Sequence, residues 1–293
     1  MFNLKGALAE GLRQKEAKHK WPEGKMHASD TGIYLKGSDG RCERQFWLRF
    51  NGYEREPDKP GKLLRYEQGN NLEEKVIEFV RKGLPGNIRL VAEQMDITHG
   101  LPYDFTGRLD ILFANEEGQH AVVDIKTWRG NAFNYNDEAK PANKLQVATY
   151  IYALNDIFNK PVNKGAVFPV DREGDNFAEE FWFLYTLEWE WKVKKALAYV
   201  KKISEMEKPP AKNQPKITIN ENKGDNSIKV ELPWQCDWCS YRGVSCKGAI
   251  PADYEEKIGK VCGHINQQGF TPLDEVEGIE QYVEPVLKQK EVI

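Results

Sequence analysis

Gly107-Arg108-Leu109-Asp110 and, after a polar segment, Ala121-Val122-Val123-Asp124-Ile125-Lys126-Thr127 are the parts of the sequence that decide the fold. The segment between them, residues 114–119, is polar and contains a glycine, so it predicts a hairpin turn between two strands. Antiparallel strands run back alongside each other, so Asp110 is expected to lie across from Asp124 and Lys126. Because side chains alternate along a strand, Asp124 and Lys126 share one face and leave the other face to the core.

Two carboxylates and an amine would therefore converge at this hairpin. Carboxylates a few ångströms apart repel each other, and a divalent cation relieves that repulsion. Oxygen ligands favour Mg²⁺ or Mn²⁺, which commonly activate a water molecule against a phosphodiester. A surface ion pair is the alternative interpretation of an Asp-x-Lys sequence taken alone.

The composition is that of a globular protein with room for a sizeable core. The chain has 293 residues, 40% of them hydrophobic, and suits one large domain with insertions or one domain plus a small one. No apolar run is long enough to cross a bilayer and the N-terminus lacks a signal-peptide core, so we expect a cytoplasmic protein without a membrane partner. The net charge of -3 gives no overall basic signature for a nucleic-acid partner, although the residues up to Arg65 carry an excess of Lys and Arg.

The five cysteines need an explanation of their own. An odd number argues against a disulfide framework. Cys236, Cys239 and Cys246 cluster, Cys42 stands far upstream, and Cys262 is interpreted as an ordinary thiol. Cys42 is expected near the start of a short helix over residues 41–49, where the helix dipole favours a thiolate; a core position is the alternative.

Residues 68–82 predict an amphipathic helix. Its expected apolar stripe consists of Leu72, Val76, Phe79 and Val80. Glu73 lies on the flank of that stripe, and a carboxylate beside a buried face needs a partner. A metal ion and a Lys or Arg side chain are the two candidates.

The rest of the chain alternates strands and helices, which predicts an α/β fold. The expected elements are a helix within 1–30, strands over 88–97 and from 105, a helix over 144–154, strands over 164–170 and 179–187, and a helix over 189–207. Residues 209–230 are polar and rich in Pro, Lys and Asn, so they predict a linker or insertion. In the helix over 144–154, Gln146 and Tyr150 lie one turn apart on the same face.

Together these residues resemble the PD-(D/E)xK nucleases, and within them the RecB-like iron–sulfur branch that includes the CRISPR-associated (Cas4-like) exonuclease. The matching motifs, in the family's order, are Gly69 to Glu73, Gly107 to Asp110, Asp124 to Lys126, Gln146 to Tyr150, and Cys-x-x-Cys with a further Cys. The resemblance implies a restriction-endonuclease-like α/β core, a central mixed sheet flanked by helices. It covers residues 30–250, closed by a four-cysteine cluster, between an N-terminal helical segment 1–29 and an acidic helical appendage 251–293.

The resemblance also implies roles for the hairpin residues. Asp110 and Asp124 would bind Mg²⁺ or Mn²⁺, and the carbonyl of Ile125 would add an oxygen ligand. Lys126 would position the attacking water and steady the developing charge.

Residues outside the hairpin would complete that site. Gln146 and Tyr150 would support Lys126 and the DNA backbone. Glu73 stands where many relatives have a His and would be a harder metal ligand. Glu93, on the neighbouring strand, is a further candidate.

By the same resemblance, Cys42 would join Cys236, Cys239 and Cys246 to bind a [4Fe–4S] cluster. Zinc is the alternative for four cysteines. The cluster is expected to be structural, because it would tie the start of the nuclease fold to its end and so reduce the entropy of the unfolded chain.

The resulting expectation is a Mg²⁺- or Mn²⁺-dependent DNA exonuclease that acts on single strands or frayed duplex ends. The aromatic residues Phe133 and Tyr135 would stack bases. One alternative is a DNA-end-binding accessory protein that works with recombination or CRISPR adaptation proteins and cleaves weakly or not at all. A site-specific endonuclease is the other, since the fold is shared with restriction enzymes.

Overall fold

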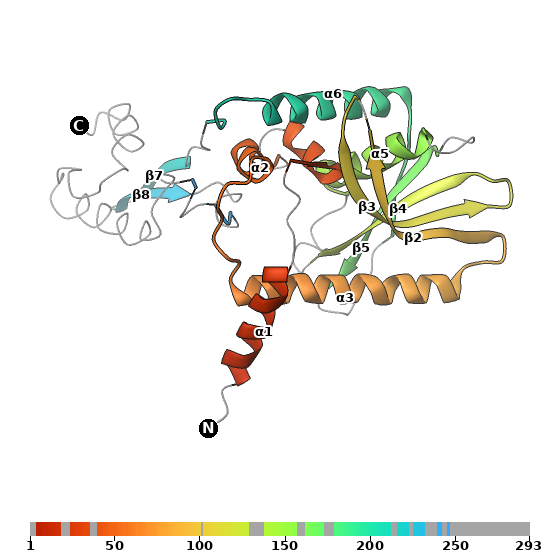
Figure 1. Cartoon of the computed structure of the whole chain (residues 1–293), viewed down its shortest axis with the longest axis horizontal. Coiled ribbons are helices and arrows are strands. Elements are labelled where there is room, and N and C mark those ends of the chain that lie inside the picture. The colour runs from red at the N-terminus through yellow and green to blue at the C-terminus, as the bar shows by residue number, and fades with distance from the viewer. Residues whose placement is uncertain are drawn as a thin grey trace. The chain divides into compact units, whose positions relative to one another are not determined.

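The computed structural model describes residues 4–18, 24–35, 40–100, 102–128, 138–156, 162–172, 179–211, 216–222, 225–231, 239–241 and 245–246 (Figure 1). The chain divides into two compact units. The first comprises residues 1–51 and 58–208, and the second comprises 52–57 and 209–293. The expected appendage 251–293 lies outside the described residues.

A six-stranded mixed sheet forms the centre of the first unit. Its strands are β1 (Met26–His27), β2 (Ile88–His99), β3 (Phe105–Asn115), β4 (His120–Trp128), β5 (Lys164–Asp171) and β6 (Phe181–Leu184). Strands β2 and β4 both run antiparallel to β3, whereas β5 runs parallel to β4. The predicted hairpin is confirmed, because β3 pairs with β4 in a register that places Ile111 opposite Val123.

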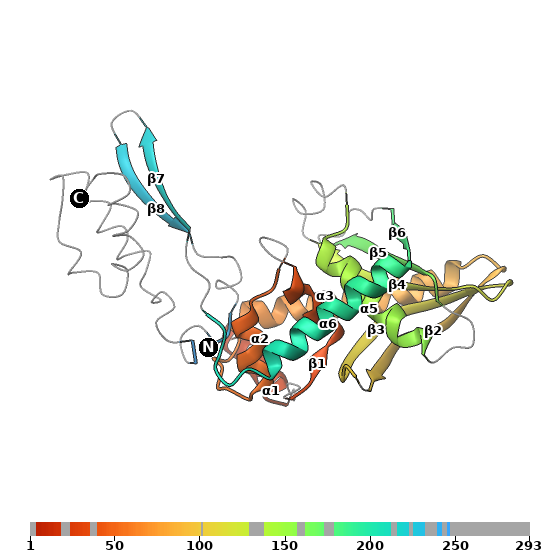
Figure 2. The same cartoon turned by 90° about the horizontal axis from the view of Figure 1, so that it is seen from above.

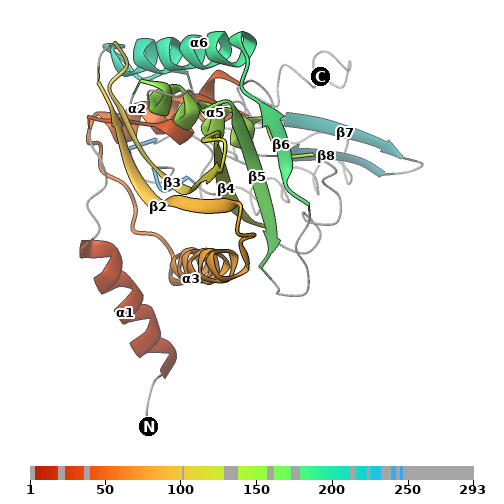
Figure 3. The ribbon, with the colours of Figure 1, turned by 90° about the vertical axis from the view of Figure 1, so that its right-hand side faces the viewer.

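Helices cover both faces of this sheet (Figure 3). The helices of the first unit are α1 (Leu4–Lys18), the 3₁₀ helix η1 (Ala28–Tyr34), α2 (Glu43–Phe50), α3 (Pro60–Gly83), α5 (Pro141–Asn155) and α6 (Leu187–Ser204). Helix α3 lies along one face, α5 packs on the other, and α6 packs over α5 (Figure 2). The expected α/β class and the mixed sheet flanked by helices are therefore confirmed. No helix of the described chain is both long and apolar enough to span a membrane.

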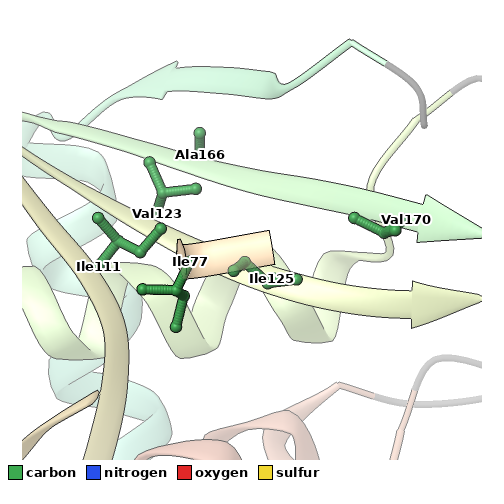
Figure 4. Close-up of a cluster of buried hydrophobic side chains, with 6 residues drawn as sticks. All are labelled: Ile77, Ile111, Val123, Ile125, Ala166 and Val170. Carbon is green, nitrogen blue, oxygen red and sulfur yellow. The ribbon is translucent and has the colours of Figure 1, made fainter. Parts of the chain in front are cut away.

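The core under α3 is built from the apolar face of the hairpin (Figure 4). Its buried residues are Ile77, Ile111, Val123, Ile125, Ala166 and Val170. Val123 and Ile125 thus occupy the core face that strand alternation predicts, which leaves the opposite face of β4 to Asp124 and Lys126.

The predicted stripe of α3 was wrong at one position. Leu72, Val76 and Val80 pack against the core as expected, but Phe79 is 65% exposed and Ile77 is only 4% exposed. Two residues along a helix rotate by about 200°, so Ile77 and Phe79 cannot share a face. Ile77 follows Val76 directly and lies one helical turn before Val80, so its side chain falls on the face that these residues turn to the core.

Of the two predictions for residues 209–230, a linker or an insertion, the structure contradicts the linker. Strands β7 (Lys216–Asn222) and β8 (Asp225–Glu231) form an antiparallel two-stranded sheet in the second unit. The register pairs Ile217 with Val230 and Ile219 with Ile228. Alternating β-branched residues favour strands, and here that preference outweighs the polar composition of the segment.

The helix expected within residues 1–30 is shorter than that range. It ends at Lys18, and the chain then enters β1 and η1, which the sequence did not predict. Strand β1 runs parallel to the first residues of β3, pairing Met26 with Phe105. This short contact places η1 beside the part of β3 that carries the expected site.

Candidate active site

Asp110 and Asp124 face each other across the hairpin of β3 and β4. The paired register ends with Ile111 opposite Val123, and Asp110 and Asp124 are the next residue of each strand, close enough for the charge of Asp124 to act on Asp110. They are 7% and 1% exposed. The Ile125 amide donates a 2.6 Å hydrogen bond to Asp110 Oδ2, and Lys126 Nζ lies 2.6 Å from Asp124 Oδ2. The structure therefore brings together the two carboxylates and the amine that the sequence predicted.

Burial controls the charge of this group. Burial raises the pKa of Asp110 well above its usual range, and the charges of Asp124 and Glu73 raise it further. Burial raises the pKa of Asp124 as well, against the opposing charge of Lys126. Burial alone would lower the pKa of Lys126, but Asp124 and Asp110 outweigh it, so that pKa lies above its usual value. Lys126 is thus an ammonium at neutral pH, and further positive charge beside the two carboxylates would favour their ionised form.

Gln146 and Tyr150 join this group from α5. Gln146 Nε2 donates to the Tyr150 hydroxyl at 3.0 Å and lies 3.4 Å from Asp124 Oδ1. The Tyr150 hydroxyl in turn donates to the carbonyl of Arg108 at 2.8 Å. This connected network fixes α5 against β3 and β4 at the two aspartates.

Gly107 is needed at its position because Tyr150 lies directly against it. A Cβ atom there would come within 2.6 Å of Tyr150 Cε1 and 3.2 Å of Ala28 Cβ. At these distances a neighbouring group would have to move. The glycine of the Gly-x-x-Asp motif therefore allows the Tyr150 ring to reach β3.

Helix α3 adds Glu73, which is half-buried. Burial raises the pKa of Glu73, and a hydrogen bond from Gln94 and the charge of Lys126 oppose this shift. Gln94 Nε2 lies 3.3 Å from Glu73 Oε1. Glu93 does not join the group, because it is exposed and forms an ion pair with Arg81 of α3.

Two residues near the site were not expected from the sequence. One is Gln94, whose neighbours in β2 gave no sign of a contact with α3. The other is Arg41, whose positive charge lowers the pKa of Asp124 and of Lys126. Its guanidinium donates to Ser29 Oγ of η1 at 3.3 Å. The sequence predicts a helix that begins at Arg41, but no local pattern indicates that this side chain lies near Asp124, which is far away in the chain.

The donor set fits a hard divalent cation. Carboxylate oxygens are the ligands that Mg²⁺ and Mn²⁺ prefer. Asp124 Oδ2 is buried and lacks an aligned hydrogen-bond donor, although Lys126 lies close to it. Among the described residues, no three His, Cys, Asp or Glu side chains converge into a ready-made metal-binding group. Asp110 Oδ2 accepts from the Ile125 amide and Asp124 Oδ2 lies beside Lys126, so a cation would share these carboxylates with the amide and the amine.

The four expected cluster ligands fall in different parts of the chain, and the structure does not describe all of them. Cys42 is the N-cap of α2, and its Sγ accepts a 3.4 Å hydrogen bond from the Gln45 amide. Cys239 and Cys246 belong to the second unit. Cys236 lies outside the described residues, as do Cys262, Phe133 and Tyr135. The iron–sulfur cluster, its zinc alternative and the base-stacking role stay predictions.

The fold and the site together define a class of protein. A mixed sheet flanked by helices, with aspartates on two adjacent strands and a lysine two residues after the second, is the core of a restriction-endonuclease-like nuclease. The chain belongs to the PD-(D/E)XK nuclease superfamily, whose family model matches residues 3–246. No curated protein matches the chain.

Solved structures with a similar fold were also found. SSO0001 is 16% identical with a TM-score of 0.42, covering 83% of this chain and 96% of that one. The alkaline exonuclease LHK-Exo from Laribacter hongkongensis is 15% identical with a TM-score of 0.43, and the match covers 67% of this chain and 94% of that one. A phage-related exonuclease from Haemophilus somnus 129PT is 15% identical with a TM-score of 0.42, and the match covers 65% of this chain and 96% of that one. Similarity at this level does not extend to activity.

Proposed function

We propose that this chain is a Mg²⁺- or Mn²⁺-dependent DNA exonuclease acting on single strands or frayed duplex ends. The observation that carries the proposal is the buried pair Asp110 and Asp124 on adjacent strands, with Lys126 in contact with Asp124. Membership of the nuclease superfamily supports hydrolysis of a phosphodiester. Exonuclease action and the preference for single strands rest on the resemblance to the RecB-like branch, which the motifs from Gly69 to Tyr150 and the cysteines carry.

The donors for the metal would be Asp110, Asp124, Glu73 and the carbonyl of Ile125. When bound, the divalent cation lowers the pKa of a water molecule and stabilises negative charge on the phosphate. Burial raises the pKa of both aspartates, and the charge of a bound cation would lower those pKa values again.

Lys126 would act as a cation and not as a base. Its raised pKa keeps the amine protonated, so it can donate hydrogen bonds to the attacking water and to the phosphate oxygens. Gln146 would hold the Asp124 carboxylate in place, and Tyr150 would hold Gln146 by linking it to the backbone of β3. The protein's contribution is thus preorganised charge around the scissile phosphate.

We also propose a structural [4Fe–4S] cluster bound by Cys42, Cys236, Cys239 and Cys246. The support is the number and order of the cysteines and the placement of Cys42 at a helix N-terminus, where thiolates are stabilised. Such a cluster would tie the start of the nuclease fold to its end and so reduce the entropy of the unfolded chain.

The decisive experiment incubates the protein with Mg²⁺ or Mn²⁺ and end-labelled linear or circular single-stranded DNA. Lys126→Ala is the test variant, and Lys164→Ala, an exposed lysine at the start of β5, is the matched control. We expect wild type and Lys164→Ala to release mononucleotides or short oligomers from the ends, and Lys126→Ala to be inactive. Cleavage of the circles would indicate an endonuclease. Binding of DNA ends without cleavage by any of the three proteins would indicate an accessory role and refute the proposal.

A further inference from the structure

Gln94 has an unusual backbone for its position in the fold. It lies in the interior of β2, yet its φ is 42°, and no other non-glycine residue of the described chain has a positive φ. This left-handed region of backbone conformation disfavours residues other than Gly, Asn and Asp. Strain of this kind persists only where the surroundings hold it, and it occurs often at functional sites.

The register shows where this distortion lies. The pairs on either side, Glu93 with Ile111 and Met95 with Leu109, place Gln94 directly opposite Asp110 of β3. A register shift between Leu90 and Ala92 precedes it in the same strand. The irregular part of β2 therefore borders one of the two aspartates of the site.

The side chain of Gln94 connects this point to α3. Its amide Nε2 lies 3.3 Å from Glu73 Oε1. The nearby cations have other carboxylate partners, since Lys126 contacts Asp124 and Arg108 pairs with Asp96 at 2.8 Å. Within the described residues, Gln94 is thus the side-chain donor on which the Glu73 carboxylate depends.

A neutral amide suits a carboxylate that must also bind a cation. An Arg or Lys at the same place would form an ion pair with Glu73 and compete with the metal. A glutamine engages one carboxylate oxygen and leaves the negative charge, with its other oxygen, available. Such supporting hydrogen bonds commonly tune the affinity of a metal site.

We infer that Gln94 is a positioning residue that holds the Glu73 carboxylate in the orientation in which it shares a divalent cation with Asp110 and Asp124. This inference rests on the proposed metal-dependent function. The strained backbone at Gln94 would then have a function, because it lets this amide reach Glu73 of α3.

The test measures Mn²⁺ affinity by calorimetry, independently of catalysis. Gln94→Ala removes the amide, and Gln94→Gly removes it while also relieving the backbone strain. Gln68→Ala, on an exposed glutamine of α3, is the matched control. We expect both Gln94 variants to bind Mn²⁺ about tenfold more weakly and the control to bind like wild type. In the metal-free protein, Gln94→Gly should melt no lower than wild type, which separates the metal effect from folding.

A double-mutant cycle with Glu73→Gln tests whether Gln94 affects Mn²⁺ affinity through the Glu73 carboxylate. On that background Gln94→Ala should cause no further loss, because the carboxylate it holds is gone. A further loss of similar size would overturn the inference, as would wild-type Mn²⁺ affinity in both Gln94 variants. If the wild type itself binds no Mn²⁺, the proposed metal-dependent function fails, and the inference fails with it.

Discussion

Replacing Gly107 by alanine tests the close packing of β3 against α5. The new Cβ would lie 2.6 Å from Tyr150 Cε1, about 1 Å closer than the usual contact between carbon atoms. Gly107 is in a paired strand and the Tyr150 ring is buried, so neither can move freely. Overpacking of this kind costs about 1–3 kcal/mol.

Moving the ring would also disturb its hydrogen bonds. The Tyr150 hydroxyl donates to the Arg108 carbonyl at 2.8 Å and accepts from Gln146 at 3.0 Å. Each bond contributes about 1 kcal/mol. We therefore expect Gly107→Ala to lower the free energy of unfolding by about 3 kcal/mol, measured by urea denaturation. Gly61→Ala, where nothing lies within 4 Å of the new Cβ, should be neutral or slightly stabilising.

Variants of Tyr150 test whether its ring is what Gly107 accommodates. Tyr150→Phe keeps Cε1, so the clash with the new Cβ should remain when Tyr150→Phe and Gly107→Ala are combined. Tyr150→Ala removes the ring, so Gly107→Ala on that background should cost far less, with a coupling energy of about 2 kcal/mol. Equal costs of Gly107→Ala on the wild-type and Tyr150→Ala backgrounds would show that the ring is not what the glycine accommodates.

The core, the buried carboxylates and the cysteines each carry a further prediction. Ile77→Ala should lower the free energy of unfolding by about 2–5 kcal/mol and Phe79→Ala by less than about 0.5 kcal/mol; equal losses in urea denaturation would contradict the packing of α3. Because the folded-state pKa of Asp110 is raised, the metal-free protein should lose stability as pH rises above the ordinary Asp value of about 4, and Asp110→Asn should reduce that slope in urea titrations at several pH values. Anaerobically purified protein should be brown and contain iron, and Cys246→Ser should remove the colour and lower the melting temperature; a colourless wild type with stoichiometric zinc would contradict the iron–sulfur proposal.

Local rules were sufficient for the hairpin and for the helix that faces it. A glycine-containing turn and strict alternation placed Asp110, Asp124 and Lys126 together, because a short hairpin leaves few possible registers. The one-turn spacing of Gln146 and Tyr150 likewise put both on the same side of α5. The spacing shows which side chains share a face, whereas the contacts of α5 with β3 and β4 join residues that are far apart in the chain.

The features that the sequence could not predict depend on contacts that only the tertiary fold creates. The contact of Gln94 with Glu73 requires a left-handed residue inside a strand, which propensity alone would reject. The pairing of β1 with β3 joins segments far apart in the chain, so no local pattern shows it. The four-cysteine cluster stays untested because Cys236 lies outside the described residues.

The hydrogen bond from the Ile125 amide to Asp110 has a consequence for mutagenesis. The backbone ladder between β3 and β4 extends only to Ile111 and Val123, while β3 stays paired with β2 and β4 with β5. The sheet therefore forks at the site, and the Asp110 carboxylate replaces the backbone acceptor that the Ile125 amide has lost. Asp110→Ala would leave a buried amide without an acceptor and so damage the fold as well as the chemistry. Asp110→Asn keeps an oxygen for that amide, so it is the variant that can distinguish loss of catalysis from damage to the strand pairing at the site.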